Sequence, residues 1–290
     1  MINEFKILTL KDKEIFDRFF KKYPQNTSEF TFTGLFCWRL SKNYTFTIFN
    51  NYLIIRLGDE KHHKFYQPVG PNPAQTIKKL SEIFKDSCFV RIEKNVAQVF
   101  EPNFIIRHER DMDDYVYSTK DLATFSGKKY DGKRNFLKQF EKYNAQIKSL
   151  KEIETSDIMN FQQRWCLKQD CEKDTNLITE NMAMEELLYN FKTLNVFGTA
   201  LIINNQIEGL AIGEELNSNT VIEHFEKANT DYKGIYQSLL NAFAKSLPEK
   251  YTFINREEDL GISGLRKSKL SYNPTQIIEK YAIRSRDVAC

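Results

Sequence analysis

The feature that most constrains the fold of this chain is an order of elements that occurs twice along it. Each half contains a helix, a β-hairpin, a strand, a further helix and a final strand, and the hairpins turn at Asn50-Asn51 and Asn204-Asn205. Asparagine tolerates the positive φ that a two-residue hairpin turn requires, so each pair predicts a tight turn. The predicted elements of the first half lie at 11–22, 45–57, 64–69, 77–84 and 88–93. Those of the second half lie at 156–167, 180–194, 196–213, 220–226, 234–247 and 251–255, followed by a short helix at 261–270 and a strand at 276–282.

In each half, the strand before the last helix and the strand after it are expected to form a parallel pair, because a crossover through a helix returns the chain in the same direction. The predicted fold class is therefore α/β with mixed (α+β) sheets. In sheets of this kind, ligands bind beyond the carboxyl ends of the strands. A site is thus expected near 226–234 and 255–261 of the second half.

The length and composition indicate a folded protein with two domains of ordinary size. The chain has 290 residues, of which 41% are hydrophobic and 28% charged, and this excludes intrinsic disorder. We predict an N-terminal domain at 1–115 and a C-terminal domain at 116–290 that carries the active groove. The net charge of +3 is too close to balance to indicate nucleic-acid binding by itself.

The N-terminus and the cysteines indicate a cytoplasmic protein. No charged segment leads into an apolar run at the start of the chain, and no apolar stretch approaches the roughly 20 residues that span a bilayer. The five scattered cysteines are predicted to be reduced thiols, as expected in the cytoplasm. Cys166 and Cys171 resemble half a metal site, but no second Cys/His pair follows, so no metal is predicted.

The strand predicted at 220–226 and the residues just after it carry charges inside apolar sequence. Alternation places Glu223, Phe225 and Lys227 on one face of this strand. It places His224 and Glu226 on the opposite face. One interpretation is an edge strand with a solvated face. The other is a carboxylate-lined cleft in which a glutamate takes the proton of an attacking amine. The candidate catalytic residues are Glu223 and Glu226, with His224 as a second candidate base.

Two basic segments, 120–143 and 254–274, supply the candidate phosphate-binding groups. Their charges suit a phosphate ligand, and the alternative is that they are solvated helix charges. The candidate donor- or phosphate-binding residues are Lys128, Lys133, Arg134, Asn135, Gly234, Arg266 and Lys269. The residues expected to line the groove are Asn229, Tyr232, Asn255, Glu257 and Tyr272.

The stretches SGKKYDGKRNFLKQF (126–140) and NREEDLGISGLRKSKLSYNP (255–274) resemble the signature stretches of the phosphatidylglycerol lysyltransferase C-terminal domain family. These are tandem GNAT-fold proteins related to the Fem-type aminoacyl-tRNA-dependent ligases. The resemblance implies two GNAT-like domains in tandem, with a groove in the second half. The best-known members pass lysine or alanine from a charged tRNA to a phospholipid head group.

The sequence departs from the family, and from ordinary GNAT enzymes, in two respects. The lipid-modifying members carry a large membrane domain, which this sequence does not contain. The pyrophosphate loop of CoA-dependent GNAT enzymes has the pattern Arg/Gln-x-x-Gly-x-Gly/Ala, and the stretch 231–236 keeps only its middle glycine, Gly234. Asp231 and Tyr236 stand at the other two pattern positions and argue against tight binding of CoA.

Two functions from different classes follow. The first is a soluble acyl- or aminoacyltransferase that moves a group from tRNA or CoA to an amine or hydroxyl acceptor, with no bound cofactor other than the acyl-CoA or aminoacyl-tRNA donor. Its acceptor is a small molecule or a peptide, and backbone N–H groups near Gly234 are expected to stabilise the oxyanion. The alternative is a non-catalytic GNAT-fold protein that binds a nucleotide, a peptide or RNA.

Overall fold

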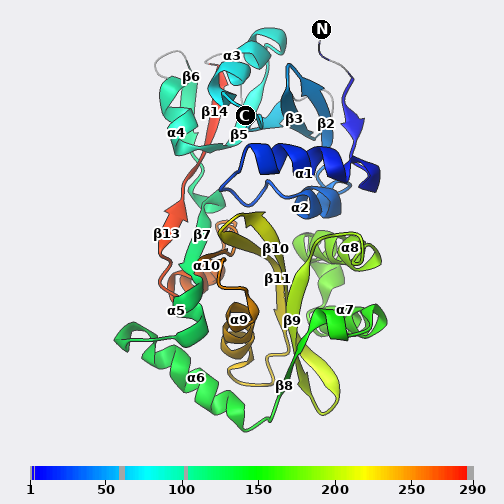
Figure 1. Ribbon diagram of the computed structural model, residues 1–290, viewed down its shortest axis with the longest axis vertical. Helices are drawn as coiled ribbons and strands as arrows, with labels where there is room; N and C mark the ends of the chain where they lie inside the picture. Colours follow the sequence, from blue (N-terminus) through cyan, green and yellow to red (C-terminus); the bar gives the residue numbers. More distant parts are fainter. Residues whose placement is uncertain (1, 3, 59–62, 101–103, 286–290) are drawn as a thin grey trace. The chain divides into compact units, whose positions relative to one another are not determined.

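The computed structural model describes residues 2, 4–58, 63–100 and 104–285, and the chain divides into two compact units. The first unit consists of Met1–Tyr115, Glu257–Arg266 and Ile277–Cys290, and the second of Val116–Arg256 and Lys267–Gln276. Figure 1 shows the course of the chain through both units. Each unit is built around one mixed sheet.

The sheet of the first unit has seven strands in the order β1-β2-β3-β4-β5-β14-β6. Its strands are β1 (Lys6–Ile7), β2 (Thr45–Phe49), β3 (Tyr52–Leu57), β4 (Lys64–Tyr66), β5 (Cys88–Glu93), β6 (Phe104–His108) and β14 (Lys280–Ser285). Its helices are α1 (Lys13–Lys22), α2 (Phe32–Trp38), α3 (Pro73–Ile83) and α4 (Lys94–Ala97). Apolar side chains of β3, β4, β5 and α3 form its core, among them the fully buried Ile54, Phe65 and Phe89.

The second sheet has the order β13-β7-β12-β11-β10-β9-β8. Its strands are β7 (Asp114–Ser118), β8 (Gln146–Ser149), β9 (Phe197–Ile203), β10 (Gln206–Asn217), β11 (Thr220–Ala228), β12 (Phe253–Asn255) and β13 (Gln276–Ile278). The later helices are α5 (Thr119–Thr124), α6 (Asp131–Glu141), α7 (Thr155–Lys168), α8 (Thr175–Tyr189), α9 (Ile235–Ser246) and α10 (Ser263–Leu270). In Figure 1, α9 covers one face of β9, β10 and β11, and α7 with α8 covers the other. The apolar stripe of α9, which includes Leu239, Leu240 and Phe243, is buried in the core of the second unit.

Both predicted hairpins and both predicted parallel pairs are confirmed. Asn50 and Asn51 join β2 to β3 with φ of 49° and 64°, and Asn204 and Asn205 join β9 to β10 with φ of 51° and 63°. In the first unit β4 pairs parallel to β5, and in the second β11 pairs parallel to β12. The carboxyl ends of β11 and β12 therefore meet at one edge, where the sequence places the site.

The C-terminal part of the chain departs from the predicted division at 1–115 and 116–290. The strand predicted at 276–282 is two strands, β13 and β14, and they belong to different sheets. β14 pairs antiparallel with both β5 and β6 and so completes the sheet of the first unit. The prediction assigned this strand to the second half because the pairing partner of a strand is not encoded in its own pattern.

The prediction that all cysteines are reduced thiols is wrong for Cys88, Cys166 and Cys171, which are disulfide-bonded. Cys166 and Cys171 form a disulfide. Among the described residues, no group of three or more His, Cys, Asp or Glu side chains could hold a metal ion. In the same part of the chain, no helix is long and apolar enough to cross a membrane.

Candidate active site

A β-bulge in β11 places its charged side chains differently from the predicted alternation. Ile212 of β10 pairs with Phe225, and the next residue, Gly213, pairs with Glu223, so one extra residue of β11, His224, lies between these two pairs. Gly213 makes this close approach sterically feasible, since a Cβ atom there would lie 2.2 Å from the carbonyl oxygen of Ile222. A bulge resets the side-chain period of a strand. Glu223 and Glu226, which were predicted on opposite faces, consequently reach the same partner.

That partner is Arg256, which directly follows β12 at the carboxyl edge of the sheet. Its Nε donates to Glu223 Oε2 and its Nη2 donates to Glu226 Oε2. The three side chains are buried, with exposed fractions of 10% for Arg256, 2% for Glu223 and 15% for Glu226. Within the described part of the chain, the Oε1 atoms of both glutamates are buried and have no hydrogen-bond partner. The cluster therefore holds two carboxylate oxygens that can each accept a hydrogen bond from a further group.

The charge balance of this cluster controls its protonation. Burial raises the pKa of Glu226 to about 8; the Arg256 guanidinium opposes this shift, and the negative charge of Glu223 adds to it. Burial disfavours the charge of Arg256, but the two carboxylates outweigh this and hold the Arg256 pKa well above its usual range. Glu226 is thus a carboxyl group that changes protonation state close to neutral pH.

Residues of α6 and of the segment around α10 surround the cluster. The Lys133 Nζ lies 3.5 Å from the centroid of the Tyr272 ring and donates to Ser271 Oγ at 2.6 Å. Burial, together with the nearby Arg256, lowers the pKa of Lys133 to about 8. The Lys269 Nζ donates to the carbonyl oxygen of Arg256. Of the predicted phosphate-binding and groove residues, Lys133, Lys269 and Tyr272 therefore surround the two glutamates.

The aromatic rings of this site pack against the guanidinium. The rings of Tyr117 and Tyr272 have their centroids 5.8 Å and 5.4 Å from the Arg256 Cζ. Burial and the negative charges of Glu226 and Glu223 raise the pKa of Tyr272, which keeps its hydroxyl protonated. Both tyrosines are nearly inaccessible to solvent, so the guanidinium is held between apolar surfaces and two carboxylates.

His224, the second candidate base, is not part of this cluster. Its Nε2 lies 2.9 Å from Glu214 Oε1 of β10, and both side chains are buried. This pairing with a carboxylate of the neighbouring strand gives the buried imidazole of His224 a structural role. The structure does not bring it together with the other two catalytic candidates.

Four of the predicted phosphate-binding residues lie away from the cluster. Arg134 donates to the carbonyl oxygens of Phe125 and Gly127 and pairs with Asp131 in the same turn. Arg266 belongs to the first unit, where it donates to both oxygens of Asp259 at 2.8 Å and to Asp111 at 2.6 Å. The guanidinium groups of Arg134 and Arg266 thus already donate to carboxylate or carbonyl oxygens of the protein. Lys128 and Asn135 are exposed on the surface.

Gly234 has a packing role that the sequence did not reveal. It precedes α9 with a φ of 89°, and a Cβ atom at this position would lie 2.4 Å from the carbonyl oxygen of Phe136 in α6. Helix α6 therefore lies against the N-terminus of α9, where the backbone N–H groups of Gly234 were expected to face an oxyanion. The contact explains why residue 234 is a glycine. The oxyanion role expected of the backbone N–H groups near Gly234 stays a prediction.

The remaining groove candidates have local structural partners. The Asn229 side chain donates to Glu208 at 2.9 Å and accepts from Lys168 at 2.6 Å. The Tyr232 ring packs edge-on against Tyr143, with ring centroids 5.0 Å apart. Asn255 is fully buried at the end of β12.

Glu257 belongs to the first unit. There its backbone carbonyl accepts from the N–H of Tyr115 at 3.2 Å.

Sequence reasoning missed Arg256 and Tyr117. The signal for Arg256 was present, because a single arginine precedes three acidic residues at the carboxyl end of the strand where the site was expected. Tyr117 lies on β7, whose pairing with β12 no local pattern predicted.

Comparison with known proteins gives a family match for this chain. The chain matches the family model described as "Phosphatidylglycerol lysyltransferase, C-terminal" over residues 20–284. It is 31% identical to an uncharacterized protein of Mycoplasmoides gallisepticum over 174 residues, which are 59% of this chain and 55% of that protein. The chain thus spans about half the length of this curated relative.

Solved structures agree with the two-unit fold. A conserved protein of unknown function from Bacteroides thetaiotaomicron VPI-5482 is 31% identical, with 99% of this chain and 100% of that chain covered and a TM-score of 0.90. L-PGS from Bacillus licheniformis is 15% identical, with 96% and 93% covered and a TM-score of 0.65, and at this identity the likeness shows the fold alone. The predicted α/β fold of two GNAT-like halves in tandem is confirmed.

Proposed function

The chain belongs to the phosphatidylglycerol lysyltransferase C-terminal family, and on that premise we propose that its second unit transfers an aminoacyl group from the ester of a charged tRNA to an amine or hydroxyl acceptor. The observation that carries this proposal is the buried cluster of Glu223, Glu226 and Arg256. It offers two carboxylate oxygens without a partner among the described residues, and one of these carboxyls has a pKa near 8.

In the proposed reaction, Glu226 is the general base. Its unpaired Oε1 accepts the proton of the acceptor group while the acceptor attacks the ester carbonyl carbon. The tetrahedral intermediate then collapses, the bond from that carbon to the tRNA ribose oxygen breaks, and Glu226 returns the proton to this leaving oxygen. Arg256 holds both glutamates in place, and the ammonium group of Lys269 contributes positive charge near the developing oxyanion.

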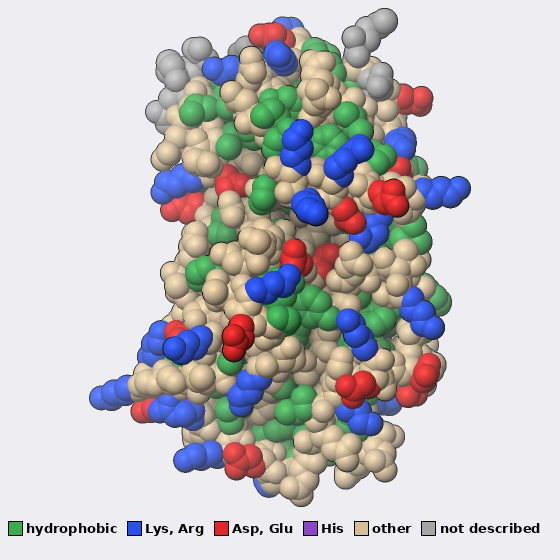
Figure 2. Space-filling model, viewed as in Figure 1, with side chains coloured by type: hydrophobic (Ala, Val, Ile, Leu, Met, Phe, Trp, Pro, Cys, Tyr) green, Lys and Arg blue, Asp and Glu red, His purple; other side chains and the backbone are tan. Residues whose placement is uncertain are grey.

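The packing of α6 favours tRNA over CoA as the donor. CoA-dependent GNAT enzymes bind pyrophosphate at the N-terminus of the helix that follows the splayed strand, and here the Phe136 carbonyl lies against Gly234 at that position. In Figure 2, Lys and Arg side chains gather over the part of the surface that α5 and α6 occupy in Figure 1. The exposed lysines of this segment are Lys120, Lys128, Lys129, Lys138 and Lys142. They suit the phosphate backbone of an RNA, and the proposal places the protein in the cytoplasm, which contains charged tRNA.

The test is transfer from radiolabelled lysyl- or alanyl-tRNA to amine, peptide and phospholipid acceptors. We expect Glu226→Gln to lower turnover by about 10²–10⁴, the usual contribution of a general base. Turnover should also rise with pH through about 8, because Glu226 must lose its proton to act. Glu249→Gln, at an exposed position, is the matched control and should retain activity.

The outcomes separate the alternatives. Wild-type turnover in Glu226→Gln would show that the proposed base is wrong. Binding of charged tRNA without consumption of any donor would favour a non-catalytic RNA-binding protein. If the exposed lysines contact tRNA, replacing Lys138 and Lys142 with glutamate should weaken binding and reduce its dependence on salt.

A further inference from the structure

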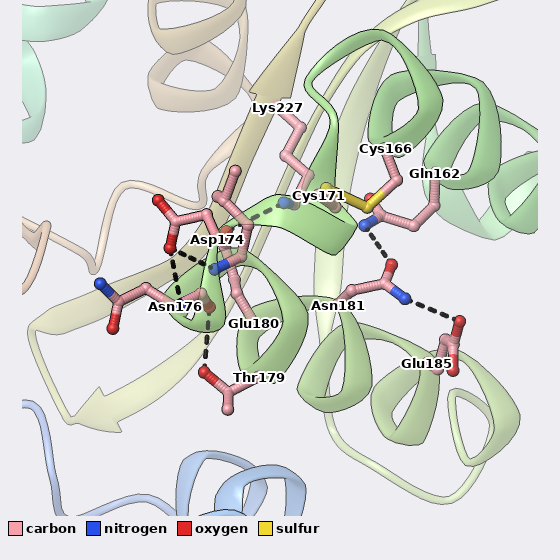
Figure 3. The surroundings of a disulfide bond; sticks show 11 residues. Gln162, Cys166, Cys171, Asp174, Asn176, Thr179, Glu180, Asn181, Glu185 and Lys227 are labelled. Atoms are coloured by element: carbon pink, nitrogen blue, oxygen red, sulfur yellow. Dashed lines mark hydrogen bonds and ion pairs between the residues drawn. A yellow bond between two sulfur atoms is a disulfide. The ribbon is translucent and has the colours of Figure 1, made fainter.

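The disulfide lies at the end of α7, beside the strand that carries the glutamates. It joins Cys166, in the last turn of α7, to Cys171, which begins the short 3₁₀ helix Cys171–Lys173 ahead of α8. Figure 3 shows this pair with Lys227 of β11 and the first turns of α8 around it. The four residues between the cysteines are exposed, Cys166 is half-buried and Cys171 is buried. Cys166 is thus the less buried of the two bonded cysteines.

Residues on both sides of Cys166 hold the carboxyl end of β11. Trp165 Nε1 donates to the carbonyl oxygen of Ala228 at 3.2 Å. Lys168 Nζ donates to Asn229 Oδ1 at 2.6 Å and pairs with Asp231 at 2.5 Å. Within a single turn of α7, these two side chains therefore fix the segment 228–231, which begins two residues after Glu226.

The other side of the disulfide reaches the same strand through α8. Lys227 of β11 is buried, and its Nζ lies 3.7 Å from the centroid of the Trp165 ring and 3.1 Å from Glu180 Oε2 of α8. Burial lowers the pKa of Lys227, which makes its charge dependent on these two partners. The disulfide consequently joins the last turn of α7, which holds residues 228–231, to the short helix that leads into α8, whose Glu180 pairs with Lys227.

We propose that Cys166–Cys171 is a reversible thiol–disulfide site at which a dithiol reductant controls how firmly the carboxyl end of β11 is held. A thiolate of the reductant attacks Cys166 Sγ, the bond between the two sulfurs breaks, and Cys171 leaves as a thiolate that takes up a proton. The second thiol of the reductant then attacks the mixed disulfide and releases Cys166 as a thiol. Two electrons pass to the protein, and the reductant becomes a disulfide.

Reduction acts locally because the bond closes a short loop. A cross-link over a sequence separation of five residues removes little entropy from the unfolded chain compared with a long-range one, so the fold does not depend on it. Its loss instead frees the last turn of α7, and with it Trp165 and Lys168. The segment 228–231 then opens more often while the rest of the sheet stays paired.

The test uses the whole protein, isolated without reductant and kept in native buffer. Alkylation with iodoacetamide followed by peptide mapping should label Cys166 and Cys171 only after treatment with dithiothreitol. Hydrogen exchange measured by mass spectrometry should become several-fold faster at residues 227–231 after the same treatment. Exchange in the hairpin at 45–57 should not change.

Three variants make the assignment specific. Cys166→Ser/Cys171→Ser should show the faster exchange with and without dithiothreitol, and Trp165→Phe should show part of it while the disulfide is intact. Cys37→Ser, which alters a buried thiol in the other unit, should behave like the wild type. Labelling of both cysteines without reductant, reduction only in denaturant, or exchange at 227–231 that ignores dithiothreitol would each overturn the proposal. None of these measurements depends on transfer activity, so their result is independent of the proposed function.

Discussion

The two buried glutamates Glu223 and Glu226 share the single positive charge of the Arg256 guanidinium. This excess of negative charge determines their protonation. A buried carboxylate is stable when its oxygens receive hydrogen bonds or positive charge, and here one oxygen of each glutamate receives a bond from Arg256 while the other receives none from the described residues. Proton uptake by Glu226 relieves the remaining repulsion. The site is thus more costly in its fully ionised state than in its singly protonated one.

The raised pKa of Glu226 makes stability depend on pH in a definite direction. The folded carboxyl keeps its proton up to about pH 8, whereas the unfolded carboxyl loses it near 4.5. The free energy of unfolding should therefore fall as pH rises from about 4.5 to 8, by at most about 1.4 kcal/mol per pH unit from this group. Urea unfolding between pH 5 and 8 should show a weaker decline for Glu226→Gln than for the wild type. Parallel curves for the two proteins would contradict the assignment.

Arg256 is the residue whose loss should cost the most stability in this site. Arg256→Ala leaves two buried carboxylates without a counter-charge, which typically costs about 3–5 kcal/mol. Adding Glu223→Gln and Glu226→Gln to this variant should recover part of the loss. Arg107→Ala is the control, because the Arg107 side chain is 67% exposed and its removal should change the free energy of unfolding by less than about 0.5 kcal/mol. Equal losses in Arg256→Ala and Arg107→Ala, measured by chemical denaturation, would refute the buried ion cluster.

Sequence reasoning identified the glutamates but not their arrangement. Charges in an apolar strand at the carboxyl edge of a sheet indicated Glu223 and Glu226, and both lie in the cluster. The bulge that brings them together depends on the pairing of β11 with β10, which the strand's own alternation does not contain. Arg134 and Arg266 were chosen for the density of basic residues in their segments and for the family motifs, and the acceptors they bind became visible only in three dimensions.

Among the secondary-structure elements, the most predictable were those whose turns need a special backbone conformation. The two Asn-Asn pairs gave both hairpins because asparagine adopts positive φ more readily than other side chains. Gly234 also has positive φ, but the sequence could not show that α6 packs against it. The contact of α6 with α9 joins residues about a hundred positions apart, and no local pattern predicts it.

Three glycines test that contact. Gly234→Ala should destabilise the protein by more than about 2 kcal/mol, because it combines a positive φ with a Cβ atom 2.4 Å from the Phe136 carbonyl oxygen. Gly127→Ala has a similar φ but open space, and about 1 kcal/mol is expected. Gly132→Ala lies in α6 with open space and ordinary φ, so it should stabilise by about 0.5–1 kcal/mol. Thermal or urea unfolding gives the three values, and any other rank order would contradict the packing of α6 on α9.

The two units are not consecutive pieces of the chain, and this has a consequence for the first one. Its sheet contains β14, which lies between β5 and β6 and pairs with both. Without β14, no strand connects β5 to β6 in the sheet. The prediction of a domain at 1–115 contained β5 and β6 but not the strand that joins them.

Buried charges strengthen the dependence of the first unit on its C-terminal strand. Lys280 of β14 is fully buried, with its Nζ 2.7 Å from Asp114 Oδ1 and 2.7 Å from Glu29 Oε1. Burial raises the pKa of Glu29 to about 7, while the Lys280 and Arg91 charges oppose that shift. If Lys280 were removed, Asp114 and Glu29 would lose their shared ammonium group in a dry environment, which is among the larger single costs to a fold.

A fragment of residues 1–115 should therefore not fold by itself. Its β5 and β6 would expose unpaired edges, and Asp114 and Glu29 would lose the Lys280 ammonium group, which leaves Glu29 with Arg91 alone as a counter-charge. The same fragment joined through a flexible linker to residues 257–290 should recover native-like circular dichroism and a cooperative urea transition. In that fusion, Lys280→Met keeps the apolar stem but removes the charge, so it should lower the free energy of unfolding by about 3–5 kcal/mol. A cooperative transition in 1–115 alone would show instead that β14 is an accessory strand, and the first unit would then end where the sequence placed it.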